Sequence, residues 1–189
     1  MLTVPQVKDL LSRRLCEYRY VHSLNVADEA RRLAAIYGED GDRAYYAGLI
    51  HDAMKDVTHD SALSYMKNYG INLTELELAG TKLWHSILGA DYAARFIGVT
   101  DEGIINAVRY HTTARAGMSL LEKIIYLADY TSAERSYNGV EDMRAAVDVS
   151  LEKAMKIALD FTVNDLNSKG VPIHPDTLAA LNEINVILT

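Results

Sequence analysis

Two aspartates in this sequence each follow a strongly apolar run. Residues 44–50 lead into His51 and Asp52, and residues 124–128 lead into Asp129. Runs that are apolar on every side predict buried helices. A carboxylate at the end of a buried helix costs several kcal/mol unless a cation compensates it, and neither run contains a lysine or an arginine. A divalent metal ion is therefore the simplest candidate for the compensating charge.

Histidines strengthen this interpretation, because four of the six lie among apolar neighbours in segments that we predict to be helical. Any one of them alone is more simply a hydrogen-bonded core residue, but the joint pattern favours a metal site. The long intervals between them suit one ligand per helix, all projecting into the centre of a helical bundle. Imidazole and carboxylate ligands without thiolate suit iron, manganese, cobalt, nickel or zinc. The candidate ligands, in order, are His22, His51, Asp52, His85, His111 and Asp129.

Three cationic residues lie close to these candidate ligands along the chain. Lys55 is four residues after His51, and Arg19 is three residues before His22, so each shares a helix face with its histidine. Arg135 follows the second apolar run. Cations beside a metal site favour an anion that also contacts the metal, such as a phosphate. The alternative is that each is an ordinary surface charge.

The elements that must position these residues are predicted to be helices. The three prolines, at positions 5, 172 and 175, lie near the ends of the sequence, so none of them interrupts the backbone in between. No alternating apolar and polar stretch is long enough for a strand. Helices are expected near residues 21–37, 42–54, 60–69, 82–96, 102–111 and 119–130.

Three further helices are expected toward the ends of the sequence. A capping box of Thr3 and Gln6 predicts the start of a first helix. Apolar residues from position 143 to position 161 predict one long amphipathic helix. Pro175 predicts the start of a last helix. The sequence therefore predicts an all-α fold and one domain over residues 1–189.

Composition excludes several functional classes. The 189 residues carry 19 lysines and arginines against 26 aspartates and glutamates, for a net charge of −7. Such an acidic chain is a poor candidate for nucleic-acid binding or for a polybasic membrane contact. No apolar run approaches the ~20 residues of a membrane span. The single cysteine, Cys16, excludes an internal disulfide and favours the cytoplasm.

The ordered residues His22, His51-Asp52 and Asp129 resemble the H…HD…D signature of the HD-domain metal-dependent phosphohydrolases. His85 and His111 match the fuller six-ligand form of that superfamily. Two longer strings, GLIHDAMKD at residues 48–56 and RYHTT followed by MSLLEKIIYLAD within residues 109–129, resemble its YqeK-type branch. That branch comprises symmetrical diadenosine tetraphosphate hydrolases. The resemblance covers roughly residues 15–180.

This resemblance implies an HD-type helical bundle with a central metal site, formed by a core of about residues 17–135 with C-terminal helices of about 140–189 packed on it. It implies a divalent metal, with iron the first candidate, held by His22, His51, Asp52 and Asp129. A second metal position at His85 and His111 is an alternative to phosphate binding by these two residues. The implied substrate-binding residues are Arg19, Lys55, His85, His111, Thr112, Arg135, Ile173 and His174.

The activity implied is hydrolysis of diadenosine tetraphosphate to two ADP, with Asp52, Lys55 and Asp129 as catalytic residues. The partner would be a small nucleotide polyphosphate, with ADP or GDP as product-like ligands, and a homodimer is an open expectation. Two alternatives remain at this point: another HD phosphohydrolase acting on a nucleoside monophosphate or a guanosine polyphosphate, and a non-catalytic nucleotide or metal sensor. One departure stands out, because residues 131–134 replace the Ile-Glu-Pro-like turn that the branch usually shows before Arg135.

Overall fold

The computed structural model describes residues 1–189 and contains only helices and their connections, as the sequence predicts. The first half consists of α1 (Val4–Arg14), α2 (Glu17–Tyr37), α3 (Gly41–Ile50), α4 (His59–Tyr69), α5 (Glu75–Ala79), the 3-10 turn η1 (Thr81–Leu83), α6 (Trp84–Tyr92) and the π-helical turn η2 (Ala93–Ile97). The second half consists of α7 (Glu102–Tyr110), α8 (Leu120–Thr131), α9 (Val140–Val147), α10 (Leu151–Ser168) and α11 (Pro175–Ile187).

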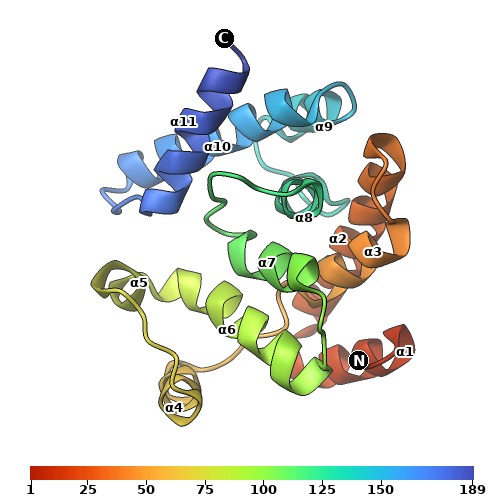
Figure 1. Ribbon diagram of the computed structural model, residues 1–189, viewed down its shortest axis with the longest axis vertical. Helices are drawn as coiled ribbons and strands as arrows, with labels where there is room; N and C mark the ends of the chain where they lie inside the picture. Colours follow the sequence, from red (N-terminus) through yellow and green to blue (C-terminus); the bar gives the residue numbers. More distant parts are fainter.

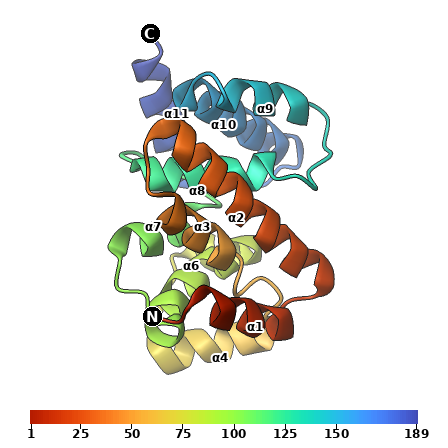
Figure 2. The same ribbon diagram turned by 90° about the vertical axis from the view of Figure 1, so that its right-hand side faces the viewer.

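Helix α8 lies at the centre of the molecule. Figure 1 views it nearly end-on, with α2 and α3 on one side, α7 beneath it and the C-terminal helices α9–α11 above it. Figure 2 shows that the C-terminal helices lie at one end of the molecule and that α1 and α4 lie at the other. The chain folds as a single helical domain, in which α8 joins the C-terminal helices to the rest.

The apolar core explains why α8 is central. Leu121, Ile124, Ile125 and Leu127 of α8 are fully buried, and burying each such side chain stabilises the fold by about 1.5–3 kcal/mol. The core is continuous from α1 to α11. It therefore ties α8 to α2 and α3, which come from the N-terminal part of the sequence.

The expectation of one long helix across residues 143–161 is wrong, because the chain leaves the helix after Val147 and starts α10 at Leu151. The Ser150 side chain accepts a hydrogen bond from the backbone N–H of Lys153 at 3.3 Å and so caps the new helix. Both Val147 and Leu151 are buried, whereas Val149 between them is 77% exposed. The break thus divides the segment into α9 and α10, which both pack against α8.

Smaller differences concern helix ends. Helix α3 stops at Ile50, before the expected end at residue 54, and residues 51–56 form turns. The short helix α5 was not expected. The expected capping box at the start of α1 is present, with the Gln6 side chain accepting from the Thr3 backbone N–H at 2.8 Å. None of the helices combines the length and the apolar character that crossing a membrane would need.

Candidate metal and phosphate site

The close packing of α2 against α3 places the first two histidines beside each other. A Cβ added at Gly48 of α3 would lie only 2.9 Å from the Ala27 Cα of α2, so only glycine permits this approach. His22 lies in α2, and His51 immediately follows α3. Both are buried, and their ring centroids are 5.2 Å apart. Two helices packed side by side therefore present their imidazoles to one point.

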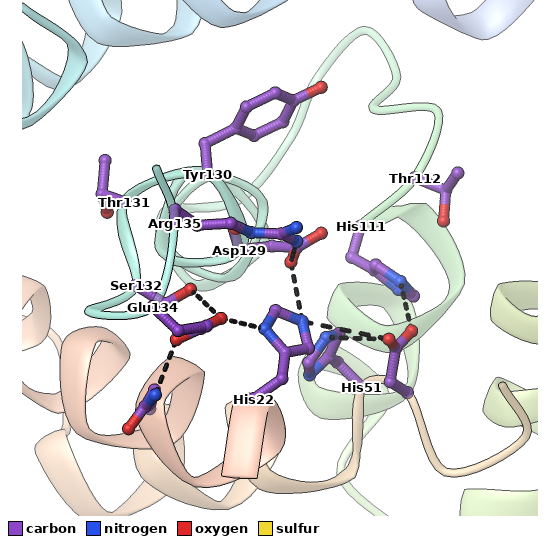
Figure 3. A network of polar contacts seen from close by, with 12 residues as sticks. His22, His51, His111, Thr112, Asp129, Tyr130, Thr131, Ser132, Glu134 and Arg135 are labelled. Atoms are coloured by element: carbon purple, nitrogen blue, oxygen red, sulfur yellow. Dashed lines mark hydrogen bonds and ion pairs between the residues drawn. The ribbon is translucent and has the colours of Figure 1, made fainter. Parts of the chain in front are cut away.

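Helix α8 adds a carboxylate at the same point. The Asp129 Oδ1 atom lies 3.0 Å from the His22 Nε2 atom, and a dashed line in Figure 3 marks this contact. One ligand atom from each of His22, His51 and Asp129 falls within 4.8 Å of the others. A second group of the same kind consists of His51, Asp52 and His111, so the two groups share His51. The structure thus brings together residues that the sequence separates by more than a hundred positions.

Asp52 faces basic groups on all sides. Its Oδ1 atom lies 3.2 Å from His85 Nε2, 3.4 Å from His111 Nε2 and 3.4 Å from Lys55 Nζ. Its Oδ2 atom lies 3.7 Å from His51 Nε2, 3.9 Å from His22 Nε2 and 3.8 Å from an Arg19 Nη1 atom. Every one of the sequence-predicted metal ligands is therefore within reach of this one buried carboxylate or of Asp129.

Two inward-facing atoms of the cluster have no hydrogen-bond partner. They are His51 Nε2 and Asp52 Oδ1. His22 Nε2 meets only carboxylate oxygens, that of Asp129 at 3.0 Å and that of Asp52 at 3.9 Å. The Nδ1 atom of His51 donates to the Gly48 carbonyl at 2.6 Å, which assigns the proton to Nδ1 and leaves a lone pair on Nε2. Buried polar atoms without a partner are costly. Unpartnered imidazole and carboxylate atoms that converge on one point fit a divalent metal ion.

The ionisation of His22 and Asp129 is coupled. Burial lowers the pKa of His22, but its hydrogen bonds to Asp129 and Glu134 outweigh burial and raise that pKa to about 9. Burial opposes ionisation of Asp129, yet the His22 hydrogen bond and nearby Arg135 hold the pKa of this carboxyl well below its usual range. The proton held here occupies the place that a cation would take, and metal binding would release it.

His51, His85 and Asp52 have the protonation states that metal ligands require. Burial lowers the pKa of His51 to about 4. Burial, with His111 nearby, also lowers the pKa of His85 well below its ordinary value. Burial would raise the pKa of Asp52, but His51, His111 and Lys55 hold it well below the usual range. Neutral imidazoles and an ionised carboxylate are the metal-binding forms of these side chains.

His85 and His111 face each other at the edge of the cluster. Their Nε2 atoms are 3.1 Å apart, and the Nδ1 atom of His111 donates to the Val108 carbonyl at 2.7 Å. Lys55 donates from Nζ to His85 Nε2 at 2.9 Å, and the Thr112 hydroxyl lies 3.3 Å from the same atom. Both the second-metal and the phosphate-binding alternatives suit this arrangement.

The expected phosphate-binding cations line the same site in different ways. Arg19 and Lys55 reach Asp52 from α2 and from the turn after α3. Arg135 donates from Nε to the Asp129 backbone carbonyl at 2.7 Å and also pairs with the Asp129 carboxylate. All three side chains are about a quarter to a third exposed, with values of 30%, 27% and 28%. They therefore stand between the buried cluster and solvent.

Ile173 and His174 lie apart from the cluster. His174 caps α11, its Nδ1 atom accepting from the Asp176 backbone N–H at 3.2 Å. Its Nε2 atom lies 3.7 Å from the Glu77 carboxylate, which also accepts from Arg109 at 2.7 Å. His174 thus contacts Glu77 of α5, the same carboxylate that pairs with Arg109 of α7, and none of the metal ligands.

The loop after α8 contributes residues that the sequence did not single out as ligands or substrate contacts. The Glu134 carboxylate contacts the Nδ1 atom of His22, on the opposite side of the ring from Asp129 (Figure 3). Asn25, three residues after His22 on α2, donates to Glu134 at 2.6 Å. The only sequence feature that pointed to this loop was its departure from the usual Ile-Glu-Pro-like turn at residues 131–134. The effect of that departure depends on where the loop meets α2.

Comparisons with known proteins agree with this geometry. The HD domain family model matches residues 19–134. The symmetrical bis(5'-nucleosyl)-tetraphosphatase of Halalkalibacterium halodurans is 37% identical, over 93% of both chains. The enzyme of the same name from Bacillus subtilis is 34% identical, over 91% of this chain and 92% of its own.

A solved structure also matches. The crystal structure of a Clostridium acetobutylicum protein, described as a predicted HD superfamily hydrolase involved in NAD metabolism, has a TM-score of 0.95, 39% sequence identity and 99% coverage of both chains. The match extends over the C-terminal helices as well as the residues of the family model. The chain belongs to the HD-domain family and, within it, to the group that includes the symmetrical bis(5'-nucleosyl)-tetraphosphatases.

Proposed function

We propose that this protein is a metal-dependent phosphohydrolase that cleaves dinucleoside tetraphosphates, such as diadenosine tetraphosphate, symmetrically. One water is consumed, the central P–O–P bond breaks and two nucleoside diphosphates form. The observation that carries the proposal is a buried cluster of unpartnered imidazole and carboxylate atoms bordered by three part-exposed cations. The names of relatives at 37% and 34% identity support this substrate.

In this proposal His22, His51, Asp52 and Asp129 hold one divalent metal, for which we favour iron over manganese, cobalt, nickel and zinc. The metal supplies Lewis-acid stabilisation of phosphate charge and lowers the pKa of a water molecule. Asp52 and Asp129 carry the negative charge that retains the metal, since both carboxyls have pKa values well below their usual range. Either carboxylate can also orient the attacking water.

Lys55 and the two arginines hold the polyphosphate. Lys55 already sits 3.4 Å from Asp52, so a phosphate beside the metal would come within its reach. Phosphoryl transfer depends mainly on positioning and on neutralising charge at the phosphoryl oxygens. Arg19 and Arg135, which also border the cluster, supply further positive charge on the solvent side. This arrangement reconciles the net charge of −7 with an anionic substrate.

His85, His111 and Thr112 complete the phosphate side of the site. The pKa of His85 lies well below its ordinary value, so its ring is neutral at pH 7 and offers either a lone pair or one N–H to the substrate. The Thr112 hydroxyl beside it can donate to a phosphate oxygen. Ile173 and His174 would contact the nucleoside portion, further from the metal.

The test is to identify the products from a panel of nucleotides incubated with protein purified without oxygen. Diadenosine tetraphosphate should give ADP alone. Formation of ATP and AMP would contradict symmetrical cleavage. Preferential release of phosphate from a nucleoside monophosphate, or of pyrophosphate from a guanosine polyphosphate, would favour another phosphohydrolase activity. Nucleotide binding without turnover across several divalent metals would favour a sensor.

A small soluble nucleotide as substrate would place the enzyme in the cytoplasm, and the exposed free thiol of Cys16 suits that reducing compartment. A homodimer remains a prediction. Light scattering coupled to size-exclusion chromatography would decide it, with a mass near twice that of one chain expected.

A further inference from the structure

Glu134 lies in the loop after α8 but reaches a candidate metal ligand on α2. Its Oε1 atom contacts the His22 Nδ1 atom, while Asp129 and the other candidate ligands face Nε2 on the opposite side of the ring. A carboxylate can only accept hydrogen bonds here. Once metal binding releases the proton from Nε2, His22 therefore keeps its other proton on Nδ1 and turns the lone pair of Nε2 toward the cluster.

The Glu134 carboxylate is itself held in place. Its Oε1 atom also accepts from the Ser132 hydroxyl at 2.8 Å, and its Oε2 atom accepts from the Asn25 side chain at 2.6 Å. Asn25 is on the same helix as His22, so Glu134 is bound at two points of α2. Both carboxylate oxygens are thus fixed, and the orientation of the His22 ring is fixed with them.

The loop that carries Glu134 is anchored by Arg144 of α9. Arg144 donates to the backbone carbonyls of Thr131 at 3.1 Å, Ser132 at 2.8 Å and Arg135 at 3.0 Å. The bonds to Thr131 and Ser132 satisfy carbonyls at the end of α8 that have no partner within the helix, and the bond to Arg135 holds the loop beyond it. The loop that replaces the usual turn of this branch is therefore firmly placed rather than loosely connected.

We propose that Glu134 is a positioning residue for metal binding, which fixes the tautomer and ring orientation of His22 through its Nδ1 atom and is held in turn by Asn25 and Ser132. Carboxylates that bind the distal nitrogen of a ligating histidine raise its basicity and orient its ring, and their loss typically costs about 10–100-fold in metal affinity or activity. The inference rests on the proposed function, because it requires His22 to be a metal ligand.

The test compares Glu134→Gln with Glu29→Gln, both titrated with Co²⁺ as metal-free full-length protein under nitrogen. Glutamine keeps the shape of glutamate but not its charge. Glu29 is a matched control, because its carboxylate joins α2 to the end of α8 by accepting from the Thr131 hydroxyl at 2.8 Å, and it has no contact with His22. We expect Glu134→Gln to weaken Co²⁺ binding by about 10–100-fold and to alter the visible absorption of bound Co²⁺. Glu29→Gln should bind Co²⁺ like the parent protein.

Equal Co²⁺ affinity in Glu134→Gln and the parent protein would overturn the inference. Equal weakening of Co²⁺ binding in Glu134→Gln and Glu29→Gln would also overturn it. That result would show that Glu134 only connects α2 to the segment after α8 and has no specific effect on His22. Should Glu134→Gln fail to fold by circular dichroism, Asn25→Ala and Ser132→Ala replace it, since each removes one hydrogen bond to Glu134 and leaves His22 intact. These two variants should weaken Co²⁺ binding in the same direction, and parent-like binding in both would refute the proposal. A parent protein that binds no Co²⁺ would instead contradict the proposed function.

Discussion

Gly48 of α3 approaches Ala27 of α2 so closely that a Cβ at position 48 would lie 2.9 Å from the Ala27 Cα and 3.0 Å from the Val26 carbonyl oxygen. Both neighbours are backbone atoms, which cannot rotate away. We expect Gly48→Ala to destabilise the protein by about 1–3 kcal/mol, as overpacking does, despite the better helix propensity of alanine. Urea unfolding measures the change.

Gly41→Ala is the matched control for that substitution. It lies on the same helix, and its added Cβ would meet the flexible Arg31 side chain at 3.3 Å and the Arg31 carbonyl oxygen only at 4.0 Å. Its free energy of unfolding should stay within about 0.5 kcal/mol of the parent value. If Gly48→Ala were as stable as Gly41→Ala, the close contact between α2 and α3 would not constrain the site.

His51 is the ligand candidate shared by both groups of converging atoms. We expect His51→Ala to lower metal affinity and hydrolysis by more than about 100-fold. Even the loss of a residue that only hydrogen-bonds to a metal ligand lowers metal affinity or activity by about 10–100-fold. The variant should remain helical by circular dichroism. Elemental analysis after purification measures the metal content.

His59→Ala controls for the loss of a histidine, because His59 is 60% exposed at the start of α4. It should retain the parent metal content. A His51→Ala protein that also retained the parent content would remove His51 from the ligand set.

Lys55 lies beside the cluster and contacts Asp52 and His85 without being able to ligate a cation. Lys55→Met should keep the metal and lower kcat by about 100-fold to 1000-fold, a loss typical for one group that stabilises charge in the transition state. Lys67→Met, on the exposed side of α4, should leave kcat unchanged. Unchanged turnover in Lys55→Met would exclude Lys55 from the mechanism, and loss of the metal would assign it a structural role instead.

Asp101 provides a pH-dependent test of the fold away from the site. Its hydrogen bonds with Arg43 lower the pKa of this carboxyl to about 2. A carboxyl whose pKa is lower in the folded than in the unfolded protein stabilises the fold fully above the unfolded value of about 3.9. That stabilisation is lost as the pH falls through about 2.

Asp101→Asn isolates this charge, because asparagine still caps α7 well. The parent should have the higher Tm at pH 7, and the difference should shrink as the pH is lowered from 4 toward 2. A difference in Tm that stayed constant or grew toward acid pH would contradict the assignment.

Local patterns in the sequence were sufficient for most of the helices. Apolar periodicity and capping residues predicted α4, α7 and α8 to within a residue or two. The same apolar periodicity continues across residues 148–150, so it predicted one helix where the structure has α9 and α10. The spacing of apolar residues is similar whether one helix or two helices bury them. Only the Ser150 cap marked the break, and serine also occurs within helices.

Some residues of the candidate site could likewise be predicted from local sequence patterns, and others could not. His22, His51 and Asp129 stood out because polar residues in apolar segments need a partner, and the structure brings one ligand atom of each within 4.8 Å of the others. Glu134 did not stand out, since a glutamate in a polar loop looks like a surface charge. Its contact with His22 depends on how the loop after α8 folds back onto α2, which no local pattern encodes.

In the proposed mechanism, hydrolysis requires a metal held by the buried cluster. The direct measurement is the rate of ADP formation from diadenosine tetraphosphate by chelator-treated protein, before and after adding one equivalent of Fe²⁺ without oxygen. We predict no detectable ADP before the addition and ADP as the sole nucleotide product after it. ADP formation at the full rate by protein shown to be free of metal would contradict metal-dependent hydrolysis.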